Sequence, residues 1–245
     1  MSRLFAVVHE AKADFTTATE LADRVLLDTV TWLDADLLVH QREWVSHVLG
    51  DRRLAWKAVG KMAAERGIYA HGHFDGEPGQ PDASAARKAL LYLEEVLPDA
   101  KAVLLIRDQD NHPERRAGLE QARKQDRSGR VVVIGLSVVE REAWVLSGFD
   151  PEGTAETALL QHERDHLGFD PRPRSHELTA CKDDTAKRSP KRVLRTLSGG
   201  DQDRERRCWV EAQLDVLRER GDANGLATYL AEVRDRLAAI VGHVP

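Results

Sequence analysis

Short runs of apolar residues recur along the chain, and each is followed by a more polar segment. Residues 3–9, 103–106 and 130–136 show little alternation between apolar and polar side chains, which is typical of strands buried on both faces of a parallel sheet. The segments between them carry apolar residues at helical spacing. The pattern predicts an α/β fold whose strand–helix–strand units bring the C-terminal ends of the strands to one edge of a sheet.

The expected helices are delimited by residues that favour helix ends. Thr17 and Glu20 form a capping-box pattern for the first helix. Asp82 or Ser84 can cap another helix, which Pro98 stops. Helices are expected at about 16–30, 82–97 and 113–126, after 137, and as an amphipathic pair at 201–219 and 222–241.

Composition limits the classes of protein to which the chain can belong. Its 245 residues, 42% of them hydrophobic, can form one large α/β domain or one domain with an appended module. A net charge of −5 gives no overall basic signature of nucleic-acid binding. Two distant cysteines, Cys181 and Cys208, favour a reducing compartment over a disulfide framework or a zinc finger. No apolar stretch has the length of a membrane span, so we expect a soluble, cytoplasmic protein.

Acidic residues follow each of the three apolar runs. Glu10 and Asp14 follow the first, Asp108 and Asp110 the second, and Glu140 the third. On neighbouring parallel strands these carboxylates would gather at the edge where open α/β sheets bind ligands, and their mutual repulsion would require a cation. Oxygen donors of this kind suit one or two Mg²⁺ or Mn²⁺ ions. An isolated Asp-x-Asp is also typical of a solvated loop, but acidic residues at three strand ends favour a metal site.

The acidic residues also form motifs in a defined order. The chain reads Glu10-Ala-Lys-Ala-Asp14, then Asp108-Gln-Asp110, then Ser137-Val-Val-Glu140. In this order the sequence resembles the Toprim fold and, within it, the OLD-like (overcoming lysogenization defect) nucleases, over about residues 3–148. The resemblance implies a Toprim-like, Rossmann-like, mostly parallel sheet flanked by helices. It also implies a metal-dependent endonuclease that cleaves phosphodiester bonds of nucleic acid, with DNA as the favoured substrate.

Roles for the acidic residues follow from the same resemblance. Asp108 and Asp110 would hold the principal metal ion. Glu10 would be a ligand that also helps to deprotonate the attacking water. Asp14 and Glu140 would be shared ligands or ligands of a second ion.

Residues outside the acidic motifs complete the comparison. Ser137 would orient Glu140, although a serine in this position is equally typical of a helix cap. OLD-like nucleases use a downstream lysine in catalysis, and Lys187 and Lys191 are the candidates here. The chain lacks the phosphate-binding loop of the ABC-type ATPase that is usually fused to such nucleases. The resemblance therefore implies a stand-alone effector of antiviral defence that works with a separate ATPase, and it leaves a homodimer open.

The chain is expected to divide near residue 148. Residues 1–148 would form the metal-binding catalytic domain, with a helical insertion at about 32–80, and 149–245 a basic segment and a C-terminal helical extension. Between 172 and 195, eight basic residues stand against three acidic ones, which suits contact with backbone phosphates but is equally typical of a solvated helix start. The nucleic-acid-binding candidates are Arg172, Arg174, Lys187, Arg188, Lys191 and Arg192.

Two histidine pairs offer other metal ligands. His162-Glu163-Arg-Asp-His166 matches the His-Glu-x-x-His order of zinc proteases, but its polar surroundings disfavour a protease. His71 and His73 have a spacing that can bind a metal on a strand, although a polar loop edge is the more typical interpretation.

Two other functions stay open. A metal-dependent phosphatase or phosphotransferase would use Asp108 as its nucleophile and would need only the Asp-x-Asp motif. A catalytically inactive Toprim scaffold would bind an ATPase partner or nucleic acid without taking up a metal.

Overall fold

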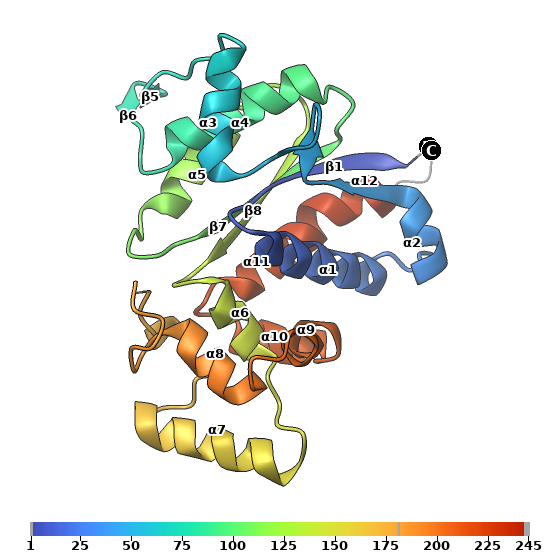
Figure 1. The fold of residues 1–245 in the computed structure, drawn as a ribbon. Coiled ribbons are helices and arrows are strands. Elements are labelled where there is room, and N and C mark those ends of the chain that lie inside the picture. The colour runs from blue at the N-terminus through green and yellow to red at the C-terminus, as the bar shows by residue number, and fades with distance from the viewer. Residues whose placement is uncertain (1, 181, 243–245) are drawn as a thin grey trace. The chain divides into compact units, whose positions relative to one another are not determined.

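The computed structural model describes residues 2–180 and 182–242 (Figure 1). These residues form two compact units. Unit 1 contains the described residues 2–107, 112–135 and 231–242, and unit 2 contains 108–111 and 136–230 apart from Cys181, which lies outside the described residues. The division differs from the boundary expected near 148, because the helix that follows residue 140 packs against later helices of unit 2.

The fold is α/β, as the sequence predicts, with a four-stranded, all-parallel sheet. The strand order β2-β1-β7-β8 places β1, β7 and β8 next to one another. In the registers of β1, Phe5 lies opposite Trp44 of β2, and Val7 lies opposite Leu104 of β7. This arrangement is consistent with a Rossmann-like fold. The strands span Arg3–Val8 (β1), Arg42–Val45 (β2), Ala102–Asp108 (β7) and Val131–Ser137 (β8).

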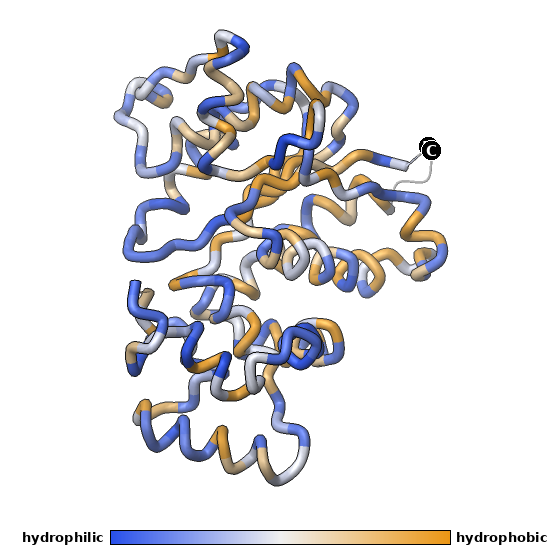
Figure 2. The backbone as a smooth tube through the Cα atoms, viewed as in Figure 1, coloured by the Kyte–Doolittle hydropathy of each residue, from blue (hydrophilic) through white to orange (hydrophobic). Residues whose placement is uncertain are grey.

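The three strands predicted from apolar runs are confirmed, and their burial explains why the sequence pattern could predict them. Residues 5–8 of β1 and 102–105 of β7 are fully buried, so both faces of each strand had to be apolar. Figure 2 shows this as a continuous hydrophobic centre along the sheet. The fourth strand, β2, lies inside the segment predicted as a helical insertion.

Helices of unit 1 cover both faces of its part of the sheet (Figure 1). On one face α3 packs against α4, and α4 against α5; on the other, α1 packs against η2 and α12. Two short hairpins, β3–β4 and β5–β6, accompany them. The bounds are α1 Lys12–Thr29, α2 Ala35–Gln41, β3 His47–Val48, β4 Arg52–Arg53, α3 Trp56–Glu65, β5 His73–Phe74, β6 Glu77–Pro78, α4 Ala83–Val96, α5 Arg115–Gln125, η2 Val233–Leu237 (a π-helical turn) and α12 Ala238–Gly242.

Unit 2 is helical beyond the end of β8. Its centre is formed by α6, which packs against η1, α8, α9 and α10. Of the two C-terminal helices predicted from the sequence, the first, at 201–219, is wrong in detail, because the segment forms two separate helices, α9 and α10. The second, predicted at 222–241, corresponds to a continuous helical segment of α11, η2 and α12, which begins in unit 2 and ends in unit 1. The bounds are α6 Arg141–Ser147, α7 Gly153–Leu167, η1 Ser175–Glu177, α8 Pro190–Ser198, α9 Gln202–Val210, α10 Leu214–Arg220 and α11 Leu226–Glu232.

Among the described residues, no helix is both long enough and apolar enough to cross a membrane.

Candidate active site

Glu10, in unit 1, is held by an arginine. The Arg107 Nη1 donates to Glu10 Oε1 at 2.6 Å, and the Arg107 Nε donates to Asp82 Oδ2 at 2.9 Å. The Arg107 guanidinium also lies over the Trp56 ring, 5.5 Å from its centroid, and its side chain is only 15% exposed. Arg107 is the residue immediately before Asp108. The sequence pattern did not single it out, because its partners are distant in the chain.

Asp82 departs from the role that the sequence predicts for it. It is the N-cap residue of α4, but its side chain makes no cap hydrogen bond. Its carboxylate instead contacts Arg107 and Arg115, the latter at 3.0 Å. Asp82 has a φ of +66°, a left-handed conformation that costs less for aspartate than for most residues. The residue therefore orders the arginine beside Glu10.

Asp14 closes the start of α1. Its Oδ2 accepts a hydrogen bond from the Ala11 amide at 2.7 Å, so the helix begins at Lys12 and not at the predicted Thr17/Glu20 capping box. The ring Nδ1 of His9 lies 2.8 Å from the Ala11 carbonyl oxygen. Burial lowers the pKa of His9, which favours a neutral ring that donates from Nδ1. These contacts fix the turn that carries Glu10, and a metal-binding role for Asp14 stays a prediction.

Unit 2 joins the Asp108–Asp110 segment to the end of β8. The Gln109 amide donates to the Ser137 carbonyl at 2.7 Å, and the Asp110 amide donates to the Val139 carbonyl at 3.0 Å. Both Asp110 and Val139 have a left-handed backbone, with φ of +50° and +76°. Such a φ is a genuine outlier for a β-branched valine and persists only where its surroundings enforce it. The strained turn therefore ties the second acidic motif to the third.

Glu140 combines burial with a cationic neighbour. Burial raises the pKa of Glu140, the Lys191 ammonium opposes that effect, and the charges of Glu142 and Asp110 add to it. The Glu140 Oε1 lies 3.4 Å from the Lys191 Nζ. Because the pKa of Glu140 stays raised despite Lys191, a further cation would stabilise its ionised form.

Lys191 remains a cation at neutral pH. Burial by itself would lower the pKa of Lys191, but Glu140, Glu142 and Asp184 raise it above its ordinary value. Lys191 Nζ lies 3.6 Å from the Asp184 Oδ1. Of the two candidate lysines, this is the one the structure places beside an acidic motif, whereas Lys187 is exposed on the surface of unit 2.

A buried asparagine that the sequence pattern did not identify supports this turn. The Asn224 amide nitrogen lies within hydrogen-bond distance of the Ala143 carbonyl and of the Ser147 and Ser175 hydroxyls. The Asn224 carbonyl accepts from the amide of Val138. The next residue, Gly225, has φ +86°, and a Cβ there would lie 2.3 Å from the Leu136 carbonyl oxygen. The Asn-Gly pair is a turn signal in the sequence, but its packing against β8 required the structure.

Ser137 does not bind Glu140 directly. Its Oγ is buried and makes no hydrogen bond within the described part of the chain. It also does not cap α6, whose N-cap residue is Glu140. A buried hydroxyl of this kind is suited to a hydrogen bond with a bound water.

The described residues contain no group of three or more His, Cys, Asp or Glu side chains arranged to hold a metal ion. Within each unit, a basic side chain stands beside the acidic motif instead: Arg107 at Glu10 and Lys191 at Glu140. The donor chemistry nevertheless fits a hard divalent cation, since the candidates are carboxylates and burial raises the pKa of Glu140.

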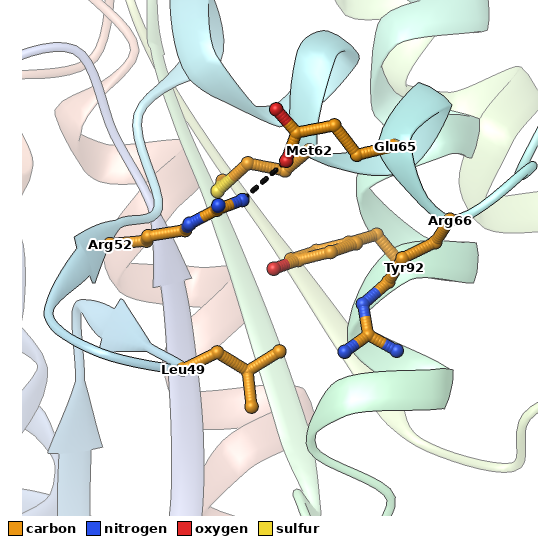
Figure 3. A pocket seen from close by; sticks show the side chains of 6 residues that line it. All are labelled: Leu49, Arg52, Met62, Glu65, Arg66 and Tyr92. Atoms are coloured by element: carbon orange, nitrogen blue, oxygen red, sulfur yellow. Dashed lines mark hydrogen bonds and ion pairs between the residues drawn. The ribbon is translucent and has the colours of Figure 1, made fainter.

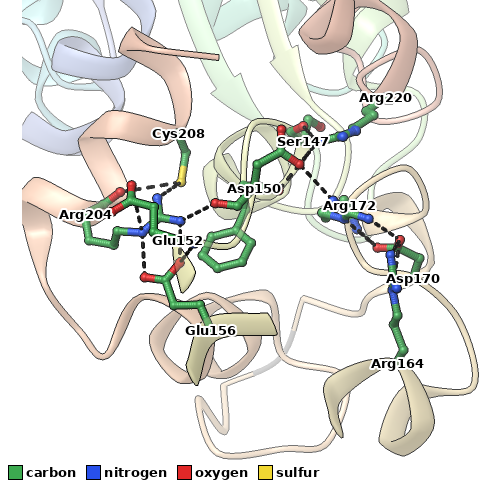
Figure 4. A network of polar contacts seen from close by, with 11 residues as sticks. Ser147, Asp150, Glu152, Glu156, Arg164, Asp170, Arg172, Arg204, Cys208 and Arg220 are labelled. Atoms are coloured by element: carbon green, nitrogen blue, oxygen red, sulfur yellow. Dashed lines mark hydrogen bonds and ion pairs between the residues drawn. The ribbon is translucent and has the colours of Figure 1, made fainter. Parts of the chain in front are cut away.

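Most of the predicted phosphate-binding arginines have carboxylate partners within unit 2. Arg172 pairs with Asp170 at 2.9 Å and with Asp150 at 2.8 Å (Figure 4). Arg174 pairs with Glu177 at 2.6 Å. The guanidinium groups of Arg174 and Arg188 both lie over the Phe169 ring. The local excess of positive charge is therefore partly neutralised by folding, and contact with nucleic acid stays a prediction.

Arg192 neutralises a fully buried carboxylate. Its Nη1 and Nη2 donate to the two carboxylate oxygens of Glu163 at 2.8 and 2.7 Å, and the Glu163 side chain is 1% exposed. A zinc protease of the His-Glu-x-x-His type needs this glutamate as an accessible general base. The paired, buried position of Glu163 argues against that chemistry.

Asp170 links two arginines and should stabilise unit 2 in a pH-dependent way. Burial alone would raise the pKa of Asp170, but hydrogen bonds from Arg172 and Arg164 lower it from 3.8 to about 2. A depressed carboxyl pKa contributes stability above the unfolded pKa, and this contribution is lost as the pH falls towards 2. We expect Asp170→Asn to reduce the free energy of unfolding by about 2 kcal/mol at pH 7, with the difference shrinking between pH 4 and 2. Urea unfolding across this range measures it; equal stability at pH 7 would contradict the expectation.

One cavity in unit 1 involves none of the predicted site residues. It has a volume of about 440 Å³ and is lined by Leu49, Arg52, Met62, Glu65, Arg66 and Tyr92 (Figure 3). Arg52 and Glu65 form an ion pair at its rim.

Comparison with protein-family models, with curated proteins and with solved structures found no match to this chain.

Proposed function

We propose that the chain is a divalent-metal-dependent nuclease that cleaves phosphodiester bonds of nucleic acid, with DNA as the favoured substrate. The observation that carries the proposal is the contact of Lys191 Nζ with Glu140 Oε1 at 3.4 Å in unit 2, beside the turn in which the Asp110 amide donates to the Val139 carbonyl. The sequence resemblance predicts roles for the second acidic motif, the third acidic motif and a downstream lysine separately. The two contacts support a common role for them. Support also comes from the strand order, since the motifs follow three neighbouring parallel strands.

The proposal assigns a separate role to each of the candidate residues. Asp108, Asp110 and Glu140, all in unit 2, would hold the cation. For Glu10 and Asp14, in unit 1, a metal-binding role rests on the sequence resemblance. Bound Mg²⁺ or Mn²⁺ would supply Lewis-acid stabilisation of the attacking and leaving oxygens. Lys191, which stays protonated, would bind a non-bridging phosphate oxygen and balance the charge that develops there. Arg107 would balance the charge of Glu10.

The first test of this function is nicking of supercoiled plasmid by the purified chain with Mg²⁺ or Mn²⁺, and its loss with a chelator. Lys191→Met, which removes the charge but keeps much of the side-chain volume, should reduce the nicking rate about a hundredfold. Mn²⁺ uptake measured by calorimetry should persist in this variant, because Lys191 is not a metal ligand in the proposal.

Lys187→Met is the matched control. It removes a lysine four residues earlier that is exposed, and we expect the rate of nicking to stay near that of the unmodified chain. A Lys191→Met variant as active as the unmodified chain would remove Lys191 from the mechanism. An equal loss in both variants would point to general phosphate binding by the basic segment instead.

A catalytically inactive Toprim scaffold is the second candidate. The observation that favours it is that Glu10 and Glu140 each already have a basic partner, Arg107 and Lys191. Failure to take up Mn²⁺ in calorimetry, together with absence of nicking, would select this alternative. In either case, work with a separate ABC-type ATPase in antiviral defence is a proposal that rests on the sequence resemblance.

A further inference from the structure

We propose that His162 and His166 form a two-imidazole site for a transition-metal ion on the surface of unit 2. Both residues lie on α7, which spans 15 residues (Figure 1), and both are exposed. Their rings are nearly parallel, with an interplanar angle of 8° and a centroid separation of 6.1 Å. Histidines four residues apart on a helix share one face, so their ring nitrogens can reach a common ion.

The observed separation is close to that of a chelating pair. A metal ion bound about 2.1 Å from each ring nitrogen lies roughly 3.2 Å from each centroid, and a tetrahedral angle then sets the centroids about 5 Å apart. The rings therefore have to approach by about 1 Å and to turn out of their parallel arrangement, because the in-plane lone pairs of parallel, stacked rings do not converge on one point. Rotation about the side-chain torsions of two exposed residues supplies this movement without a change in the helix.

The helix itself is held in place, so the backbone positions of the two histidines are fixed before the ion arrives. Leu160, Glu163 and Leu167 of α7 are buried, and Glu163 is anchored by Arg192. Arg164 pairs with Asp170 near the end of the helix. Glu163, which would complete a protease motif, thus serves as an anchor, and its Oε1 lies 4.0 Å from the His162 Nδ1. Because the backbone is already ordered, only the two side chains lose conformational entropy on binding.

The ligand type sets the selectivity. Neutral imidazole suits Zn²⁺, Ni²⁺ and Cu²⁺, whereas Mg²⁺ and Ca²⁺ prefer oxygen donors. Two protein ligands leave the remaining coordination positions to water, so the site is an open one. The site should bind Cu²⁺ more tightly than Ni²⁺ or Zn²⁺. This site is separate from the acidic motifs and does not depend on the proposed nuclease function.

Titration of the untagged full-length chain with Ni²⁺ and Cu²⁺, in a non-coordinating buffer at neutral pH with excess Mg²⁺, tests the proposal. We expect the unmodified chain to bind one ion at this pair. In His162→Gln/His166→Gln, the apparent affinity for Ni²⁺ and Cu²⁺ should be at least tenfold weaker. Electron paramagnetic resonance of the Cu²⁺ complex should show coupling to two imidazole nitrogens.

His71→Gln/His73→Gln is the matched control, because it removes another exposed, closely spaced pair, located at strand β5 of unit 1. This variant should bind the ions as the unmodified chain does. Because all four side chains are exposed, both variants should keep the circular-dichroism spectrum and melting temperature of the metal-free chain. The proposal is overturned if the unmodified chain takes up neither ion, or if uptake and the copper spectrum are unchanged in the His162/His166 variant.

Discussion

Asp110→Asn is expected to abolish metal-dependent nicking while leaving the fold intact. Asp110 has a left-handed backbone, which asparagine adopts as readily as aspartate. The substitution therefore removes the charge without adding backbone strain. Loss of a carboxylate that holds the cation should lower the nicking rate by more than about a hundredfold, since even indirect support of a metal ligand contributes 10–100-fold.

Two further variants sharpen this result. Asp108→Asn should have a similar effect on nicking, whereas Asp222→Asn, at an exposed position of unit 2, should have none. Calorimetry with Mn²⁺ should show weaker uptake in the Asp108 and Asp110 variants. Nicking at the original rate in a preparation of Asp110→Asn free of contaminating nuclease would reject the proposed role of the motif. A phosphatase with an Asp108 nucleophile would instead retain activity in a Glu10→Gln variant.

Arg192→Ala should destabilise unit 2 strongly. Glu163 is 1% exposed and both of its carboxylate oxygens accept hydrogen bonds from Arg192. Removing the guanidinium leaves a buried carboxylate without compensation, which typically costs about 3–5 kcal/mol. Denaturant unfolding and hydrogen exchange of α7 and α8 measure this effect. A loss of DNA binding in this variant would therefore not by itself identify a DNA contact.

Arg195→Ala on the same helix is the control for Arg192→Ala. Arg195 is exposed, and its removal should change the free energy of unfolding by less than about 0.5 kcal/mol. Replacing Glu163 and Arg192 together with methionine should recover most of the lost stability, because a buried ion pair and a well-packed apolar pair are often nearly equivalent. Destabilisation of less than about 1 kcal/mol in Arg192→Ala would show that the ion pair is dispensable.

Comparison of β2 with the other strands shows where the sequence pattern loses its predictive power. Strands β1, β7 and β8 are continuous apolar runs, but β2 contains Arg42 and Trp44 and is only partly buried. It depends on Asp23, whose carboxylate accepts from the Arg42 guanidinium at 2.7 and 2.5 Å and from the Trp44 indole at 3.0 Å. The partners are about 20 residues apart in the chain, and local periodicity does not report such pairs.

The acidic residues show the same limit. Their placement after three strands could be predicted, because a parallel sheet aligns the C-terminal ends of its strands. The basic groups that neutralise these acidic residues could not be predicted. Arg107 meets Glu10 across 97 positions of sequence, and Lys191 meets Glu140 only because α6 packs against α8. Counting charges between 172 and 195 likewise predicted a basic surface, whereas folding gives Arg172 and Arg192 carboxylate partners.

The sequence by itself determined the α/β class, the three central strands and the order of the acidic motifs, because burial and strand direction leave a local imprint on residue type. Tertiary structure alone decided the edge strand, the left-handed turn at Asp110 and Val139, and the pairing of Glu10 with Arg107 and of Glu140 with Lys191. The reason is physical: an ion pair or a strained turn depends on which side chains meet in space, and segments far apart in the chain supply those contacts.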